Sequence, residues 1–273
     1  MRTDNLPAGK LGPMQLVPGV TAINGWAFLL TMFFVGVLAP FINFAQPYIL
    51  TEHLGIPINE QGAVSGDLAF WSEVVMILLA GVMGAWSDTM GRRLVFAFGL
   101  AGVALSYVLY PLATSYEELL SYRLIYAVGM AAIGAMTIAI MAEYPVNQSR
   151  GKLSASVGVL STLGVMFVVA VLAPLPARFV VGGATAIEAG RYTYWLTAGI
   201  ALAGILIAWF GLSKLKTARN TALSLMQRLR IGLIAGRNPR IALSYGAAFV
   251  GRTDLVVVVI FLSLWITHVA LEQ

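Results

Sequence analysis

Long apolar runs, separated by short polar or charged segments, make up most of the chain. Apolar residues fill each run continuously instead of alternating with polar ones, which is typical of membrane-spanning helices and not of a transmembrane barrel. Each run has about the 20 residues that a helix needs to cross a bilayer. The pattern therefore predicts an all-α polytopic membrane protein. The seven predicted spans are 20–44, 63–86, 94–113, 119–142, 153–175, 192–212 and 241–267.

The composition agrees with this pattern and argues against a soluble enzyme. Hydrophobic residues form 59% of the 273 residues and charged residues only 11%, whereas a soluble domain carries about 25% charged residues. The chain has no cysteine, which excludes a disulfide framework, a thiolate metal site and a cysteine nucleophile. Its two histidines, His53 and His268, are far apart, and neither a Ser/His/Asp set nor a phosphate loop is visible. We therefore expect neither enzymatic activity nor a cofactor.

The positive residues predict the orientation. With the N-terminus inside, all but four of the 17 Lys and Arg residues fall in inner segments. The exceptions are Arg123, Arg178, Arg191 and Arg252. The positive-inside rule thus predicts a cytoplasmic N-terminus. Because this distribution accounts for the net charge of +5, we expect the lipid bilayer and not a nucleic acid as the partner of the basic residues.

A basic segment interrupts the apolar runs at residues 213–240. Its apolar residues recur at spacings of three and four, as in an amphipathic helix, which lies either on the inner membrane surface or in solvent as a connecting helix. These apolar residues are Leu215, Ala218, Ala222, Met226, Leu229 and Leu233. The predicted division is an N-terminal cytoplasmic segment 1–19, a six-helix block 20–212, a linker 213–240 and a last segment 241–273.

The loop after the second run carries glycines and charges at a distinctive spacing. These are Gly84, Asp88, Gly91, Arg92 and Arg93. Gly91 suits a tight turn, Asp88 can accept hydrogen bonds from the turn, and the arginines can pair with Asp88 or bind lipid headgroups. A plain positive-inside loop would explain the arginines alone. The spacing resembles the G-x-x-x-D-x-x-G-R-[KR] signature of the major facilitator superfamily, from which the chain departs at Trp86 and Thr89.

Two further segments resemble the same superfamily. Residues 143–152 are similar to its E-x-x-P-x-x-x-R-G-[KR] segment, with the proline one place early at Pro145. Leu119, Arg123 and Gly129 partly match a fourth-helix pattern of proton-coupled members. The run 153–175 lacks the Gly-Pro and Gly-Gly elements that mark many drug–proton antiporters.

The resemblance implies a secondary active transporter with a six-helix N-terminal bundle of 3+3 inverted repeats. Residues 241–267 would then begin an incomplete second bundle, so the missing half or a second chain is needed for transport. The implied latches on the inner side are formed by Asp88, Arg92, Glu143 and Arg150, and the glycines thought to allow close packing are Gly84, Gly91 and Gly151. We expect proton-coupled uptake of a small molecule across a bacterial inner membrane, with efflux as the alternative. The sequence does not name the substrate, the direction or the coupling ion.

Ionisable residues inside the runs are candidates for coupling or for the substrate cavity. Asp67 and Arg123 each lie about 6 Å from an outer helix end, so they either pair or reach the headgroups separately. Glu73 lies near the midplane, on a small-residue face expected to pack against other helices. It either exchanges protons or is a structural carboxyl. The other members of that face are Gly66, Ile77, Ala80 and Gly84.

The last run carries a second charged pair, Arg252 and Asp254. These residues are about 200° apart on a helical wheel and point in opposite directions. In the superfamily the first, fourth and seventh helices line the central cavity, so the resemblance implies that one of the pair faces the substrate. Asn43 and Gln46 on the first run are weaker polar candidates.

A seven-helix receptor or sensor is the alternative from another functional class. A retinal protein is excluded, because all four lysines lie in predicted inner segments. A ligand-sensing receptor would usually place its N-terminus outside, contrary to the distribution of positive residues.

Overall fold

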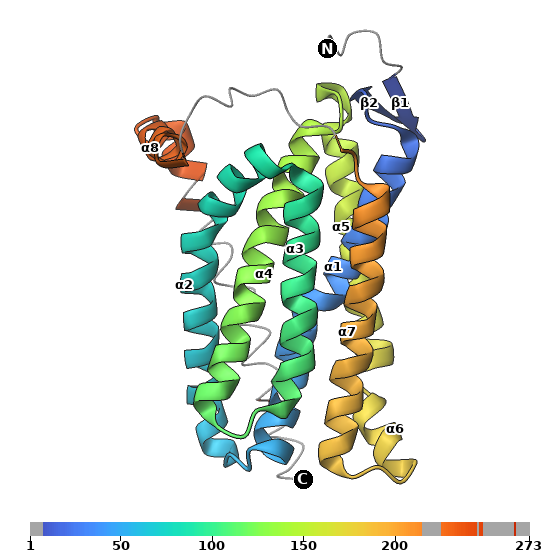
Figure 1. Cartoon of the computed structure of the whole chain (residues 1–273), viewed down its shortest axis with the longest axis vertical. Coiled ribbons are helices and arrows are strands. Elements are labelled where there is room, and N and C mark those ends of the chain that lie inside the picture. Colours follow the sequence, from blue (N-terminus) through green and yellow to red (C-terminus); the bar gives the residue numbers. More distant parts are fainter. Residues whose placement is uncertain (1–7, 215–224, 245, 248–264, 266–273) are drawn as a thin grey trace.

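Six helices are long and apolar enough to cross a membrane, within the residues that the computed structural model describes: 8–214, 225–244, 246–247 and 265 (Figure 1). Successive spans run in opposite directions and are joined by short loops. This confirms the prediction of an all-α polytopic membrane protein, and it confirms the first six predicted runs.

The spans extend beyond the predicted runs at most of their ends, because a hydropathy run stops at the first charged residues whereas the helix continues to its cap. The fifth span, Asn147–Val181, contains two helices. The elements are α1 (Ala22–Tyr48) with a π-helical turn (Ile49–His53), α2 (Ile58–Met90), α3 (Arg92–Leu109) with a 3-10 turn (Tyr110–Leu112), α4 (Tyr116–Glu143), α5 (Arg150–Phe167) with a π-helical turn (Val168–Leu172), α6 (Leu175–Val181) and α7 (Ala186–Gly211).

Side chains and prolines set several helix boundaries. Thr21, Ser115 and Thr185 each accept a hydrogen bond at 3.3 Å from the backbone N–H three residues later, which caps α1, α4 and α7. Pro174 and Pro176 follow the π-helical turn after α5. Because proline donates no backbone hydrogen bond, the fifth span breaks there and resumes as α6.

The bundle is held by close helix contacts, and its spans are covered unevenly. α3 and α4 touch at Gly99 and Gly129: a Cβ on Gly99 would lie 2.7 Å from the Gly129 carbonyl oxygen.

The spans differ in how much of their most apolar stretch is buried inside the bundle. The buried share of the residues is 56% in the first span and 61% in the third, but only 28% in the second and 22% in the fifth. The second and fifth spans therefore present most of their apolar surface outward.

A short β-hairpin precedes the first membrane helix, an addition to the predicted helical pattern. Its strands are β1 (Ala8–Leu11) and β2 (Met14–Pro18), which pair antiparallel. Leu16 is fully buried and forms a β-bridge with Pro145, between α4 and α5. The hairpin thus seals one end of the bundle, called the hairpin end below, where the α2–α3 turn and the α4–α5 loop also lie (Figure 1).

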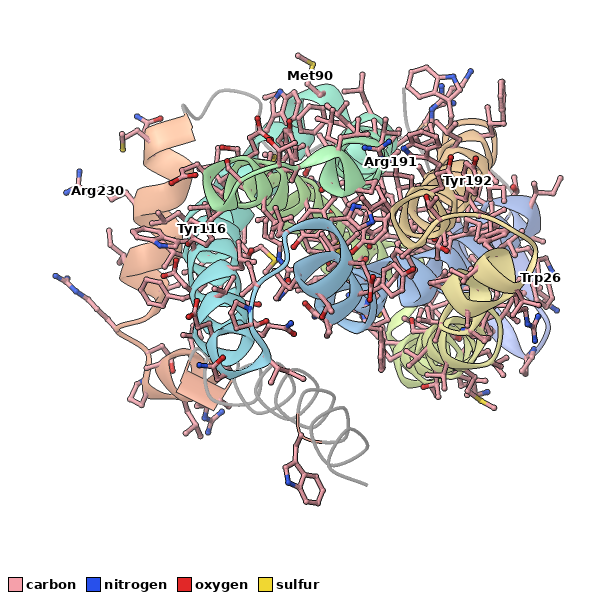
Figure 2. All side chains as sticks on the ribbon, turned by 90° about the horizontal axis from the view of Figure 1, so that it is seen from below. Trp26, Met90, Tyr116, Arg191, Tyr192 and Arg230 are labelled. Atoms are coloured by element: carbon pink, nitrogen blue, oxygen red, sulfur yellow. The ribbon has the colours of Figure 1, made fainter. Side chains whose placement is uncertain are left out.

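The predicted linker contains a helix, α8 (Leu225–Ala235), which lies beside α2 (Figure 2). Arg230 on this helix points away from the bundle in Figure 2. Helical backbone begins again at residues 239–244 and 246–247. Most of the predicted seventh span lies outside the described residues, and the domain boundaries remain predictions.

Candidate functional site

A charge cluster joins three helix ends at the hairpin end. Arg92 is 8% exposed and lies at the start of α3. Its Nη2 and Nε donate to Glu143 Oε1 and Oε2 at 2.7 and 3.1 Å, and its Nη1 lies 2.6 Å from Asp88 Oδ1. Nη1 also donates to the Ser87 hydroxyl. We call Asp88, Arg92 and Glu143 the latch, and three of the four residues that the superfamily resemblance assigned to inner latches are therefore in contact.

Gly91 alone makes the turn between α2 and α3. Its φ of 95° lies in the left-handed region that favours glycine, and its N–H donates to the Ser87 carbonyl oxygen at 2.8 Å. The turn lies between Asp88, in the last turn of α2, and Arg92, the first residue of α3, and it brings these two side chains together. The glycine in the motif is thus required by the backbone.

The other motif residues do not join the latch, and the predicted latch role of Arg150 is corrected. Arg150 Nη2 donates to the Ala142 carbonyl oxygen at 3.0 Å instead of pairing with an acid. The guanidinium carbon of Arg93 lies 4.6 Å from the centre of the Trp209 ring. A Cβ on Gly84 or Gly151 would meet no atom of the described residues within 4 Å, so neither glycine permits a close helix contact there.

Arg123 lies at the centre of a buried polar cluster between α1, α2 and α4. It is 3% exposed. Its Nη2 donates to Asn43 Oδ1 at 2.5 Å, its Nη1 to Gln46 Oε1 at 3.2 Å and its Nε to Ser72 Oγ at 3.2 Å. The guanidinium carbon lies 5.4 Å from the centre of the Tyr126 ring. Asn43 and Gln46, the weaker candidates from the sequence, are thus its direct partners.

Gln46 connects this cluster to two more side chains. Its Nε2 donates to Ser65 Oγ at 2.8 Å, and its Oε1 also accepts a hydrogen bond from the Tyr110 hydroxyl at 3.1 Å. Gln46 is 2% exposed, so all of these bonds are shielded from solvent. One amide therefore links α1, α2, α4 and the turn after α3.

The predicted pair of Asp67 and Arg123 does not form. Asp67 is exposed and accepts a hydrogen bond from the Tyr116 hydroxyl, while Arg123 is buried and does not reach the headgroups separately. The ion pairs Arg92–Asp88 and Arg92–Glu143 contain neither Asp67 nor Arg123. The side chain of Arg123 points toward α1. The position of a residue along its helix does not predict this direction around the helix axis.

The face predicted around Glu73 is also different. Glu73 is partly exposed, Ile77 is 55% exposed, and a Cβ on Gly66 or Gly84 would meet no described atom within 4 Å. The small residues of this face thus do not form a close helix contact within the described part of the chain. Arg252 and Asp254 lie outside the described residues. In that described part, no cluster of three or more potential metal ligands occurs.

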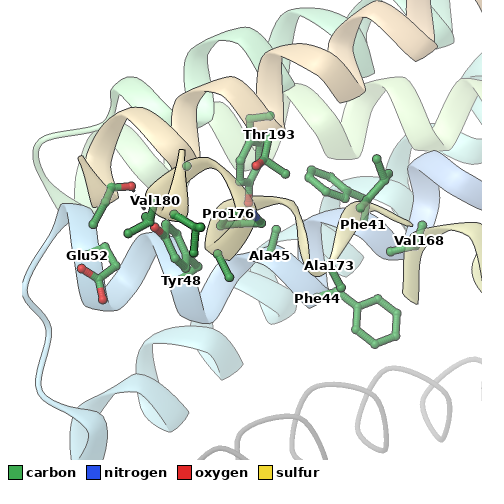
Figure 3. A pocket seen from close by; sticks show the side chains of 16 residues that line it. Phe41, Phe44, Ala45, Tyr48, Glu52, Val168, Ala173, Pro176, Val180 and Thr193 are labelled. Atoms are coloured by element: carbon green, nitrogen blue, oxygen red, sulfur yellow. Dashed lines mark hydrogen bonds between the residues drawn. The ribbon is translucent and has the colours of Figure 1, made fainter. Parts of the chain in front are cut away.

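A cavity of about 650 Å³ opens at the end of the bundle opposite the hairpin (Figure 3). Its walls come from α1, the break after α5, α6 and α7, and Glu52 is its one charged lining residue among the described residues. The rings of Phe41 and Tyr194 line it and lie 5.0 Å apart. Tyr194 stacks on Tyr110, a partner of Gln46, with ring centres 5.5 Å apart. Aromatic rings therefore separate this apolar cavity from the Arg123 cluster.

The fold and the latch define a multi-pass integral membrane protein, and comparison with known proteins gives its family. The sequence profile of the Major Facilitator Superfamily matches residues 23–271. The chain belongs to this superfamily of membrane transporters, which confirms the resemblance found in the sequence.

Individual relatives cover this chain to different extents. Magnetosome protein MamH of Paramagnetospirillum magneticum is 26% identical over 233 residues, which cover 82% of this chain and 52% of MamH. The class D tetracycline resistance protein of Salmonella ordonez is 30% identical over 128 residues, which cover 45% of this chain and 31% of that protein. The crystal structure of the human organic anion transporter MFSD10 aligns with a TM-score of 0.46 at 20% identity and covers 76% of this chain and 48% of that one. The chain thus spans about half the length of these proteins, or less.

Proposed function

We propose that the chain is part of a secondary active transporter that moves a small molecule across a bacterial inner membrane by alternating access. Protons are the proposed driving ion. The complete transporter contains a second helical bundle, supplied by a longer chain or by a second copy. Membership of the superfamily supports transport in general. The buried polar cluster around Arg123 supports a substrate site between α1, α2 and α4.

Arg123 is the observation that carries the proposal. A guanidinium stays protonated at any physiological pH, and a buried positive charge is expensive unless an anion balances it. In the described part of the chain its partners are neutral oxygens of Asn43, Gln46 and Ser72. These oxygens orient the guanidinium but do not balance its charge. An acidic group of the substrate, or a carboxylate that gains and loses a proton, would supply the balancing charge during transport.

Glu73 and Asp67 are the proposed proton-exchanging groups. Both lie on α2, which also contributes Ser72 to the Arg123 cluster. Glu73 is one residue from Ser72 and is partly shielded from solvent. Uptake is the leading direction. The relative named as a tetracycline resistance protein supports efflux as the second candidate.

The latch is the proposed inner gate. Arg92 holds Asp88 and Glu143 at the ends of α2 and α4. A second bundle that approached this end would meet these charges, and opening of the inner side would change their partners.

Transport in proteoliposomes tests the proposal. The full chain is reconstituted, a pH gradient is imposed, and tetracycline, a radiolabelled hexose and a radiolabelled dicarboxylate are the probes. We expect gradient-driven movement of at least one probe, lost in Glu73→Gln and in Arg123→Gln. Glu117→Gln, at an exposed carboxylate in the first turn of α4, is the matched control and retains transport. Unchanged transport in Glu73→Gln would exclude Glu73 from coupling, and movement of no probe would contradict a transporter in which a second copy of this chain supplies the second bundle.

A further inference from the structure

A small basic cavity lies at the hairpin end, between the first turn of α3 and the segment that follows α7. Its volume is about 190 Å³, and Arg93, Leu94, Trp209, Ser213 and Lys214 are among its lining residues. It is distinct from the Arg123 cluster, which α1, α2 and α4 form deeper in the bundle. It shares a wall with the latch because Arg92 also lines it.

Arg93 differs from its neighbour Arg92 in how its charge is used. Arg92 is held by two carboxylates, whereas Arg93 lies over the Trp209 ring at 4.6 Å and forms no ion pair within the described residues. A guanidinium over an aromatic face is oriented by it and keeps its N–H groups for other partners. Arg93 therefore offers a positioned positive charge and several hydrogen-bond donors to a group from outside the protein.

The charge around this cavity is positive. In the latch, Arg92 pairs with the carboxylates of Asp88 and Glu143, so its positive charge is already engaged. Arg93 and the exposed Lys214 contribute two positive charges on the cavity wall. The first turn of α3 adds its partial positive charge, since no side chain caps that helix. An anion of the size of a phosphate group is thus the complementary ligand.

Apolar side chains continue from the cavity along the bundle. Leu94, Phe98, Trp209 and Phe210 are between 38% and 78% exposed. α3 and α7 pack side by side, so Leu94 and Trp209, which both line the cavity, lie on neighbouring helices. A basic site at a helix end, next to an interfacial tryptophan and above an apolar surface, has the layout that a phospholipid requires.

We propose that Arg93, Lys214 and Trp209 bind the phosphate group of an anionic phospholipid, whose acyl chains lie along the surface shared by α3 and α7. The phosphate occupies the basic cavity and pairs with Arg93 and Lys214. The acyl chains cover apolar side chains that the protein leaves exposed. This site is separate from the proposed transport site and does not depend on transport.

Quenching of tryptophan fluorescence tests the site directly. The full chain in detergent micelles is titrated with phosphatidylglycerol that carries brominated acyl chains, and in parallel with brominated phosphatidylcholine. We expect stronger quenching by phosphatidylglycerol, and we expect this excess to disappear in Trp209→Phe. Arg93→Gln and Lys214→Gln should each weaken the apparent affinity about fivefold, since one basic residue contributes about 1 kcal/mol to binding of anionic lipid. Arg93→Lys should retain most of the affinity.

Controls separate a specific site from general attraction and from binding of free phosphate. Lys10→Gln removes one positive charge from the same end of the bundle, on the hairpin, and should leave quenching unchanged. An equal loss in Lys10→Gln and Arg93→Gln would overturn the proposal, as would equal quenching by the two lipids. Inorganic phosphate at millimolar concentration should not displace the lipid, and full displacement would assign the cavity to free phosphate instead. Lys214 lies outside the helices, so its variant gives an answer even if Arg93→Gln folds poorly.

Discussion

Arg92 binds both carboxylate oxygens of Glu143, at 2.7 and 3.1 Å, and so ties the start of α3 to the end of α4. The same guanidinium lies 2.6 Å from Asp88 in the last turn of α2. Three helix ends are therefore connected through one side chain. The α4–α5 loop begins directly after Glu143, so the latch also positions the segment on which the hairpin docks.

Glu143→Gln should weaken the bundle at this end. The substitution keeps the shape of the side chain but removes one of the two carboxylate charges that pair with the buried Arg92, so we expect a loss of about 1–3 kcal/mol in unfolding free energy. Thermal unfolding followed by fluorescence measures the loss. Glu117→Gln is the control, and an equal change in both variants would show that the Arg92 contact contributes little.

Gly129→Ala should disturb the contact between α3 and α4. An added Cβ would lie 2.6 Å from the Gly99 carbonyl oxygen, so the helices must separate. Gly134→Ala is the matched control on the same helix, because its Cβ would meet no described atom within 4 Å. The yield of monodisperse protein in size-exclusion chromatography should fall for Gly129→Ala alone. A normal yield of Gly129→Ala would contradict the close approach.

Gln46→Leu should be more harmful than Tyr110→Phe. Leucine would leave Arg123, Ser65 and Tyr110 each without one buried partner, at about 1–3 kcal/mol for each group, whereas Tyr110→Phe removes one neutral hydroxyl worth about 1 kcal/mol. Midpoints of thermal unfolding should therefore fall in the order wild type, Tyr110→Phe, Gln46→Leu. The reverse order of the two variants would show that Gln46 does not connect the cluster.

Leu16→Asp should release the hairpin. Leu16 is fully buried against the α4–α5 loop, and a carboxylate there would be desolvated without a partner. We expect trypsin to cleave after the exposed Lys10 at least about tenfold faster, which corresponds to a loss of about 1.4 kcal/mol in docking free energy. Gln15→Asp, at the exposed neighbouring position, should leave the cleavage rate close to that of the wild type. Equal rates in the two variants would mean that Leu16 does not anchor the hairpin.

The protein should lose stability at alkaline pH because of the buried phenol of Tyr144. Burial between the hairpin and the linker raises the pKa of this phenol to about 12. The unfolded chain loses the proton near pH 10 and the folded chain does not, so unfolding becomes easier as the pH rises from 10 to 12. Tyr144→Phe should show a flatter decline, with a difference of about 2 kcal/mol by pH 12. Parallel pH profiles of the two proteins would contradict this assignment.

The sequence predicted the membrane helices well, because burial in lipid requires long continuous apolar runs. The family resemblance also named Asp88, Arg92 and Glu143 of the latch, together with Arg150, which does not join it. The turn of one glycine explains why Asp88 and Arg92 meet. Side-chain partners across helices were harder to predict. The depth of a residue along its helix can be estimated from residue counts, but the direction of its side chain around the helix axis depends on packing. For this reason the sequence did not predict that Arg123 contacts Gln46 and not Asp67.

The hairpin and the serines of the polar cluster carried weaker signals. Residues 8–18 include Gly9, Gly12, Pro13 and Pro18, and their strands are stabilised by docking on Pro145, far away in the sequence. Ser65 and Ser72 resemble many small residues of membrane helices. Only their position opposite Gln46 and Arg123 distinguishes them.

The uneven cover of the spans has a geometric consequence. The second and fifth spans, which leave the largest share of their apolar surface outward, occupy the same place in the two triplets of helices. The apolar surface that one of these spans leaves outward is therefore repeated by the equivalent span of the other triplet. A second bundle with the same internal repeat could therefore dock so that like helices meet, and one pair of contacts would then be repeated instead of requiring two unrelated interfaces.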